Sequence, residues 1–174
     1  WCILDLDPKG APFEHVVRLA LAIRELCDEI ELPAFVKTSG STGLHVLLPL
    51  GGLCTYEQSR QLAHLVVRVI HERHRDISTI ARTISARGGK VYLDWLQNRH
   101  GQLLAAPFCV RPLQGAPVST PLEWREGGPK LEIGAFTIRT VLDRLRRAKQ
   151  DPMAPVLTTR PDLVGALERL STRL

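Results

Sequence analysis

The feature that most constrains this chain is a short hydrophobic segment, ILDLDP at residues 3–8, that carries two aspartates. Side chains of a β-strand point alternately to its two faces. Asp5 and Asp7 therefore share one face, while Leu4 and Leu6 point the other way into a core. Two carboxylates on one face repel each other and resist desolvation, so we expect cationic partners opposite them.

The composition is that of an ordinary globular domain. The chain has 174 residues, of which 44% are hydrophobic and 24% are charged. No apolar run approaches the roughly 20 residues of a membrane-spanning helix, and no signal peptide is visible. The cysteines are scattered without a C-x-x-C pair, which argues against structural zinc and favours reduced thiols in a cytoplasmic protein.

The net charge of +5 is unevenly distributed. Seven basic and two acidic residues lie between Arg60 and Lys90, whereas seven acidic and three basic residues lie between Trp1 and Glu31. An acidic start beside a basic middle suits a site that holds metal cations and grips a polyanion. Two solvated helix faces of unlike charge would give the same pattern.

The order of predicted elements indicates an α/β or α+β fold with a mixed sheet. Helical spacing of apolar residues predicts helices at 13–32 (ended by Pro33), 56–73 (capped by Thr55 and Gln58), 137–148 and 162–174. Strands are predicted at 3–7, 34–38, 44–50 and 90–96, with a hairpin joining the second and third. Another hairpin is predicted from the turn at 98–101 into residues 102–110, and the segments 76–90 and 111–124 are expected to be irregular.

A third aspartate, Asp94, lies inside the hydrophobic segment KVYLDWL. Strands are depleted in aspartate, because a short charged side chain packs poorly on a sheet. If this strand neighbours the first one, Asp94 converges with Asp5 and Asp7 into a hard, oxygen-rich site for Mg²⁺ or Mn²⁺. Two such ions can bridge an attacking hydroxyl and a leaving phosphate. Taken alone, each motif also fits a strand end or a salt-bridge partner.

A glycine-rich turn, KTSGSTGLH at residues 37–45, separates two of the predicted strands. Glycines let backbone N–H groups turn inward as an anion nest, and His45 can donate to a phosphate oxygen, more strongly when protonated. The turn leads into a strand, so it is not a Walker P-loop, which leads into a helix. A flexible hairpin tip with a packed histidine remains the alternative. The candidate phosphate-binding residues here are Ser39, Gly40, Ser41, Thr42, Gly43 and His45.

The motifs LDLDP, VKTSGSTGLHV, VYLDWLQN and APFCVRPLQGAPVSTPLEW occur in this order and resemble the polymerase domain of bacterial ligase D. The resemblance covers nearly the whole chain and is clearest over residues 3–124. That domain belongs to the archaeo-eukaryotic primase superfamily and acts in non-homologous end joining. The resemblance implies an RRM-like mixed sheet flanked by helices and a nucleotidyltransferase that extends primer 3′ ends. It also implies a preference for ribonucleotides, two Mn²⁺ or Mg²⁺ ions, and DNA ends, nucleotide triphosphates, Ku and a ligase module as partners.

Residue by residue, the resemblance makes Asp5, Asp7 and Asp94 the metal-binding triad. It implies that Ser39, His45 and Arg111 hold the nucleotide triphosphate. Three positions depart from the family pattern. Relatives often carry a basic residue in place of Thr42, and some carry arginine in place of Gln97 or Leu113.

Basic residues in the expected flexible loop before Asp94 are candidates for binding DNA phosphates. They are Arg82, Arg87 and Lys90, with solvated loop charge as the alternative reading. A second basic stretch, residues 139–149, offers another path for DNA.

Two rival functions stay open at this point: a catalytically weak module that binds DNA ends, and a metal-dependent phosphohydrolase. The polymerase domain of the family has a substantial segment before its first aspartate strand. We therefore expect residues 1–174 to be a single, N-terminally truncated catalytic domain of a cytoplasmic, nucleoid-associated protein.

Overall fold

The computed structural model describes residues 1–148 and 150–174. At its centre is a six-stranded sheet with the order β4-β5-β1-β3-β2-β6, in which β4 and β5 pair in parallel and the other neighbours are antiparallel. The predicted α/β class with a mixed sheet is therefore confirmed. The strands are β1 (Cys2–Asp7), β2 (Phe35–Thr38), β3 (Leu44–Leu48), β4 (Ser78–Thr79), β5 (Val91–Asp94) and β6 (Pro121–Leu122).

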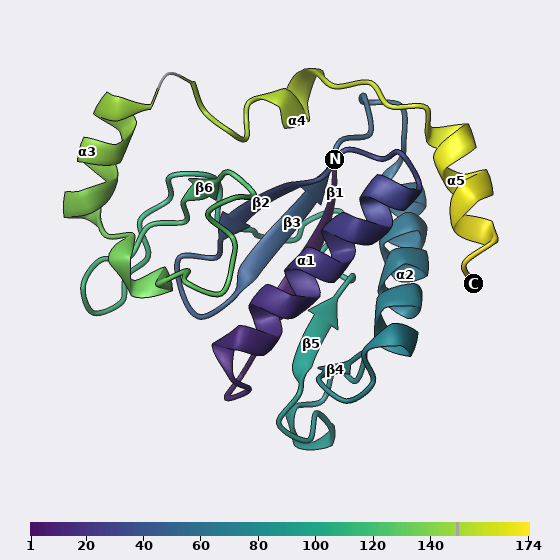
Figure 1. Ribbon diagram of the computed structural model, residues 1–174, viewed down its shortest axis with the longest axis horizontal. Coiled ribbons are helices and arrows are strands. Elements are labelled where there is room, and N and C mark those ends of the chain that lie inside the picture. The colour runs from purple at the N-terminus through teal and green to yellow at the C-terminus, as the bar shows by residue number, and fades with distance from the viewer. Residues whose placement is uncertain (149) are drawn as a thin grey trace.

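Two long helices, α1 (Phe13–Glu29) and α2 (Tyr56–Arg73), cover one face of the sheet (Figure 1). Leu4 and Leu6 of β1 are fully buried on this side, as strand alternation predicted. Helix α5 (Leu163–Ser171) lies beside α2 and contributes to the same core. The helices therefore cover this face with the hydrophobic core, and a ligand site is expected on the opposite face.

The opposite face of the sheet is divided between an apolar part and a polar part. Ile3 and Leu47 pack with Val156 of the short helix α4 (Pro155–Thr158) in a second, smaller core. One pleat further along β1 on the same face stands Asp5, outside that core. The Asp5 side chain therefore stays partly exposed on the polar part of this face.

The expected capping box of Thr55 and Gln58 is present, and α2 has the predicted bounds. The predicted C-terminal helices are confirmed as α3 (Ile138–Arg147) and α5. Short 3₁₀ turns, η1 (Ile84–Ala86) and η2 (Ile133–Ala135), complete the chain. No helix in the described ranges is long and apolar enough to cross a membrane.

The end of α1 differs from the prediction that Pro33 stops it, because the helix ends at Glu29. Glu31 adopts a left-handed backbone with a φ of 57°. Its N–H donates to Asp28 O over 3.2 Å, and the N–H of buried Leu32 donates to Cys27 O over 2.9 Å. This is the hydrogen-bond pattern of a Schellman motif, formed without the usual glycine or asparagine.

The predicted hairpin from residues 98–101 into 102–110 is wrong. Both edges of β5 are already bonded, one to β1 and one to β4, so no edge remains for a following strand. The chain instead crosses to the β2 side, where Phe108 N–H donates to Ser119 O over 2.7 Å. The segments expected to be irregular also contain the two-residue strands β4 and β6.

Strand β5 ends at Asp94, earlier than predicted, because a side chain continues its pairing with β1. Asn98 Nδ2 donates to Ile3 O over 2.7 Å, and Asn98 Oδ1 accepts from Ile3 N–H over 2.8 Å. Ser59 also donates to Asn98 Oδ1 over 3.1 Å. The buried amide of Asn98 therefore replaces a strand residue and leaves no backbone group of Ile3 unpaired.

We predict that Gly43→Ala destabilises the fold by about 3 kcal/mol or more, because overpacking against backbone cannot be relieved by a rotamer change. A Cβ at Gly43 would lie 2.1 Å from Leu6 O, between the two aspartates of β1. Chemical denaturation measures the loss. Gly128→Ala is the control, since nothing lies within 4 Å of its Cβ position. Equal stability of the two variants would show that β3 does not pack against β1 in this way.

Candidate active site

Four polar side chains form one row across the open face of the sheet. Asp94 of β5 is the register partner of Asp5 on β1, and Asp5 is the partner of His45 on β3. His45 in turn is the partner of Lys37 on β2. Directly opposed residues of antiparallel strands bring their side chains together on one face. The sheet thus sets two acids, one imidazole and one amine side by side.

Asp5 is the electrostatic centre of this row. Its side chain is 21% exposed, and His45 Nε2 lies 3.4 Å from its Oδ1. Burial, followed by the charges of Asp94 and Asp7, raises the pKa of Asp5 to about 7, against the opposing effect of Lys37 and Arg111. The face therefore carries more negative charge than its own cations neutralise.

Asp7 has a cationic partner, as expected for a carboxylate beside another on one strand face. Arg87 Nη1 donates to Asp7 Oδ2 over 2.7 Å. The guanidinium stacks on the ring of Tyr92, 4.3 Å from its centroid, and Nη2 donates to Arg82 O. Arg87 is 8% exposed, so it does not belong to a solvated loop.

Asp94 is held by three donors. The Leu96 N–H donates to its Oδ1 over 2.8 Å, and the Tyr92 hydroxyl donates to the same oxygen over 3.3 Å. Gln97 Nε2 donates to Oδ2 over 3.0 Å. Gln97 thus orients the carboxylate with a neutral group.

The three carboxylates share a face, but they are not gathered into a ligand cage. Among residues 1–148 and 150–174, no group of three or more His, Cys, Asp or Glu side chains is arranged to hold a metal ion. Asp7 and Asp94 instead face the internal donors Arg87 and Gln97. The donor set nevertheless fits a divalent cation, because hard carboxylate oxygens under mutual repulsion gain most from a bound cation.

Two N–H groups of the glycine-rich turn are directed inward, onto a side chain of the same turn. The N–H groups of Ser41 and Gly43 both donate to Ser39 Oγ, each over 3.1 Å. The hydroxyl of Ser39 thus occupies the point on which these donors converge. Thr42 is exposed at the tip of the turn.

Both glycines of the turn are needed for close packing, and Gly40 is needed for its backbone conformation as well. Gly40 has a φ of 72°, and a Cβ there would lie 2.8 Å from both Arg111 Cγ and Ser119 N. Arg111 Nη1 donates to Ser39 O over 3.0 Å. The turn and Arg111, predicted separately as phosphate-binding groups, are therefore in contact.

The stronger donation expected of a protonated His45 is not supported by its surroundings. It is 4% exposed. Burial, with Lys37 and Arg111 adding to it, holds the pKa of His45 well below its ordinary value of 6.5. The imidazole is therefore neutral at physiological pH and can donate only one hydrogen bond.

The three residues predicted to bind DNA do not form one patch. Arg82 is exposed, whereas Arg87 is engaged with Asp7. Lys90 Nζ donates to Arg75 O over 2.5 Å. In the alternative basic stretch, Arg139 is exposed on α3, and residue 149 lies outside the described residues.

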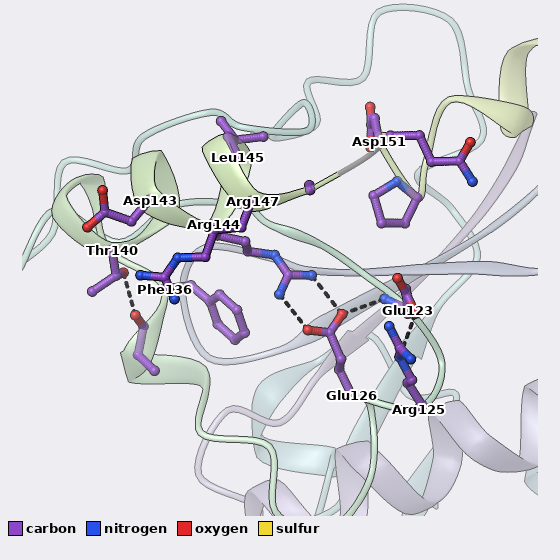
Figure 2. A pocket seen from close by; sticks show the side chains of 14 residues that line it. Glu123, Arg125, Glu126, Phe136, Thr140, Asp143, Arg144, Leu145, Arg147 and Asp151 are labelled. Carbon is purple, nitrogen blue, oxygen red and sulfur yellow. Dashed lines mark hydrogen bonds and ion pairs between the residues drawn. The ribbon is translucent and has the colours of Figure 1, made fainter.

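A separate pocket lies beside α3, away from the predicted site residues. Figure 2 shows Arg144 reaching from α3 to Glu126, with Phe136 beneath and Asp143 on the outer side. The residues that line this pocket include neither the row of Asp94, Asp5, His45 and Lys37 nor any residue of the glycine-rich turn. The polar row on the sheet, rather than this pocket, carries the chemistry indicated by the sequence.

Comparison with known protein families shows to which family the chain belongs. The model of the LigD primase-polymerase domain matches residues 1–153. This chain belongs to that family. The resemblance inferred from the motifs is confirmed, and so is the class of enzyme, because the family is that of a primase-like polymerase domain.

Individual LigD proteins and a solved structure agree with the assignment. The bifunctional non-homologous end joining protein LigD of Bacillus subtilis is 32% identical over 147 residues, covering 83% of this chain and 24% of that protein. The multifunctional LigD of Pseudomonas aeruginosa is 31% identical over 173 residues, covering 96% of this chain and 20% of that protein. The polymerase domain from Mycobacterium tuberculosis ligase D, solved in complex with DNA, superposes with a TM-score of 0.82 at 31% identity.

That superposition covers 92% of this chain and 55% of the mycobacterial chain, so the expected primase-type fold is confirmed. The chain spans about a quarter or less of the length of the LigD proteins it matches. The sequence motifs included Lys37 in the glycine-rich turn and Gln97 as a departure from the family pattern, but they assigned no role to either and did not identify Asn98. Only the cross-strand register of Lys37 with His45 could have signalled the first of these.

We predict that Asp5→Asn stabilises the protein at pH 8 by about 2–4 kcal/mol and has little effect at pH 4. Because the pKa of Asp5 is raised to about 7, its ionisation destabilises the fold progressively as pH rises from about 4 to 7. Thermal or urea denaturation at both pH values measures the difference. Asp143→Asn, on the exposed side of α3, is the control. Parallel pH profiles for wild type and Asp5→Asn would contradict this electrostatic description.

Proposed function

We propose that this chain is the catalytic core of a nucleotidyltransferase that adds nucleotides to primer 3′ ends during the repair of DNA double-strand breaks by non-homologous end joining. The observation that carries the proposal is the register of Asp5 with Asp94, beside a glycine-rich turn, in a member of the LigD primase-polymerase family. Acidic residues next to a phosphate-binding turn are what nucleotidyl transfer requires.

Asp5, Asp7 and Asp94 would hold two divalent cations, Mn²⁺ or Mg²⁺. Bound there, the ions would lower the pKa of the primer 3′-hydroxyl and neutralise the triphosphate and the leaving pyrophosphate. The raised pKa of Asp5 and the shared face of the three carboxylates support this assignment. The partners Arg87 and Gln97 keep Asp7 and Asp94 oriented toward the polar face.

The triphosphate would bind along the turn at residues 39–43, with His45 and Arg111 at its base. The N–H groups of Ser41 and Gly43 converge on Ser39 Oγ, and they would bind a phosphate oxygen in place of that hydroxyl. His45 would act as a neutral donor rather than as an imidazolium. A preference for ribonucleotides belongs to this proposal.

Primer-template DNA ends are the proposed macromolecular substrate, with Ku and a ligase module as partners in a cytoplasmic, nucleoid-associated repair complex. The polymerase domain from Mycobacterium tuberculosis ligase D, solved in complex with DNA, supports the DNA part of the proposal. Arg82 and Lys90, together with Arg87, remain the proposed contacts to DNA phosphates.

We predict that Asp5→Ala and Asp7→Ala each reduce primer extension at least about a hundredfold while DNA binding persists. Each change removes a carboxylate from the proposed cation site. Extension, pyrophosphate release and DNA affinity are measured on the same samples, with Asp28→Asn on α1 as a surface control. Near-normal extension in either variant would reject the assignment. Release of inorganic phosphate instead of pyrophosphate would favour a phosphohydrolase, and DNA binding without extension by the wild type would favour a DNA-end-binding module.

We predict that Arg82→Ala/Lys90→Ala weakens DNA binding equally for all sequences and flattens the plot of log affinity against log salt. Removal of each side chain that binds a phosphate should change the slope by about 0.7–0.9. Arg87 is left intact, because it also holds Asp7. The matched variant is Arg139→Ala/Arg147→Ala on α3. An unchanged slope in the first variant and a flatter one in the second would move the DNA path to α3.

A further inference from the structure

The lysine at the end of the polar row is buried, which is unusual for this residue type. Lys37 has no exposed surface. Its Nζ lies 2.6 Å from Ser119 Oγ, 2.8 Å from Ala105 O and 2.8 Å from His45 Nδ1, with a longer contact of 3.4 Å to Thr38 O. Lys37 therefore cannot touch a substrate, and whatever it does for the site must pass through a neighbour.

The hydrogen bonds around Lys37 fix which group donates to which. Ser119 Oγ donates its own proton to Thr38 O over 2.9 Å, so it accepts from Lys37. Ala105 O is a carbonyl and only accepts. An ammonium has three N–H donors, and the third is satisfied when His45 Nδ1 accepts it. Burial lowers the pKa of Lys37 to about 8, so the amine is still an ammonium at pH 7.

This arrangement has one consequence for His45. An imidazole whose Nδ1 accepts a hydrogen bond carries its proton on Nε2. Nε2 lies on the side of Asp5, 3.4 Å from its Oδ1. A partner on one ring nitrogen also orients the ring and selects its tautomer. The single N–H of His45 is thus presented to the polar face.

We propose that Lys37 is a positioning residue whose buried ammonium donates to His45 Nδ1 and thereby holds the imidazole with its Nε2–H directed at the polar face beside Asp5, next to the place proposed for the nucleotide phosphates. The inference rests on the proposed function, because it assumes that a triphosphate binds on this face. It adds a residue that has no access to ligand and acts only through His45.

A purely structural role for Lys37 gives a different expectation. Through Ala105 and Ser119, Lys37 also ties β2 to the segment that follows β5. A variant could therefore weaken the fold without any specific effect on His45. The decisive experiments must separate these two roles.

The first experiment uses the wild-type protein and needs no variant. Long-range ¹H–¹⁵N NMR of histidine-labelled protein at pH 7 reports which ring nitrogen of His45 is protonated and whether the other accepts a hydrogen bond. We expect a proton on Nε2 and an Nδ1 shifted toward the hydrogen-bonded range. A proton on Nδ1 would overturn the proposal, whatever the nucleotide affinity.

The second experiment is a double-mutant cycle with ATP and Mg²⁺ as the probe. Lys37→Met removes the donor at similar volume, and His45→Gln keeps an N–H near the Nε2 position without an acceptor at Nδ1. Lys37→Met should weaken ATP binding about tenfold in the wild-type background and less than about twofold beside His45→Gln. Thr120→Val, which removes a buried hydroxyl that donates to Val118 O, is the control and should leave ATP affinity unchanged in both backgrounds.

The outcomes distinguish this inference from the proposed function. Equal losses in the two backgrounds would show that Lys37 is only a packing residue and would overturn the inference. Absence of ATP binding to the wild type would reject the proposed function, while the NMR measurement would still decide the state of His45.

Discussion

Crowding of negative charge on one face of a sheet is the constraint on which the rest of this structure depends. Two carboxylates from neighbouring strands, Asp5 and Asp94, stand directly opposite each other. Like charges in that relation are destabilising, and burial adds to the cost. The buried ammonium of Lys37, together with Arg111, opposes the negative charge around Asp5. On the other side, Arg87 pairs with Asp7.

The sheet order makes this balance possible. Strand β1 is central and has antiparallel neighbours on both sides, so Asp5 is flanked by Asp94 from β5 and by His45 from β3. Gly43 lets the turn before β3 approach Leu6 O, and the amide of Asn98 completes the pairing of β1 where β5 ends. The helices on the other face bury Leu4 and Leu6 and hold the central strand in place. The register of the sheet therefore places Asp5, Asp94 and His45 side by side, and the glycine-rich turn and Arg111 lie next to them.

Much of this could be predicted from local sequence patterns. Alternation placed Asp5 and Asp7 on one face, helical periodicity located the helices, and the capping box fixed the start of α2. What failed depends on contacts between distant residues. The hairpin at 98–110 was wrong because both edges of β5 are occupied, which no local pattern reveals. The end of α1 was missed because Glu31 takes a left-handed conformation that the sequence signals only when glycine or asparagine is present. The burial and the role of Lys37 could not be predicted, because its partners Ala105 and Ser119 lie far along the chain.

The most direct test of this description is to locate Mn²⁺ on the protein by the broadening of backbone amide signals in NMR spectra. If Asp5, Asp7 and Asp94 form the cation site, substoichiometric Mn²⁺ should first broaden the amide signals of β1 around Asp5 and of β5 around Asp94. Asp5→Asn should abolish that effect. Broadening that begins instead at the acidic residues of α1 or around Glu126, and that Asp5→Asn leaves unchanged, would contradict the assignment of the sheet face as the catalytic centre.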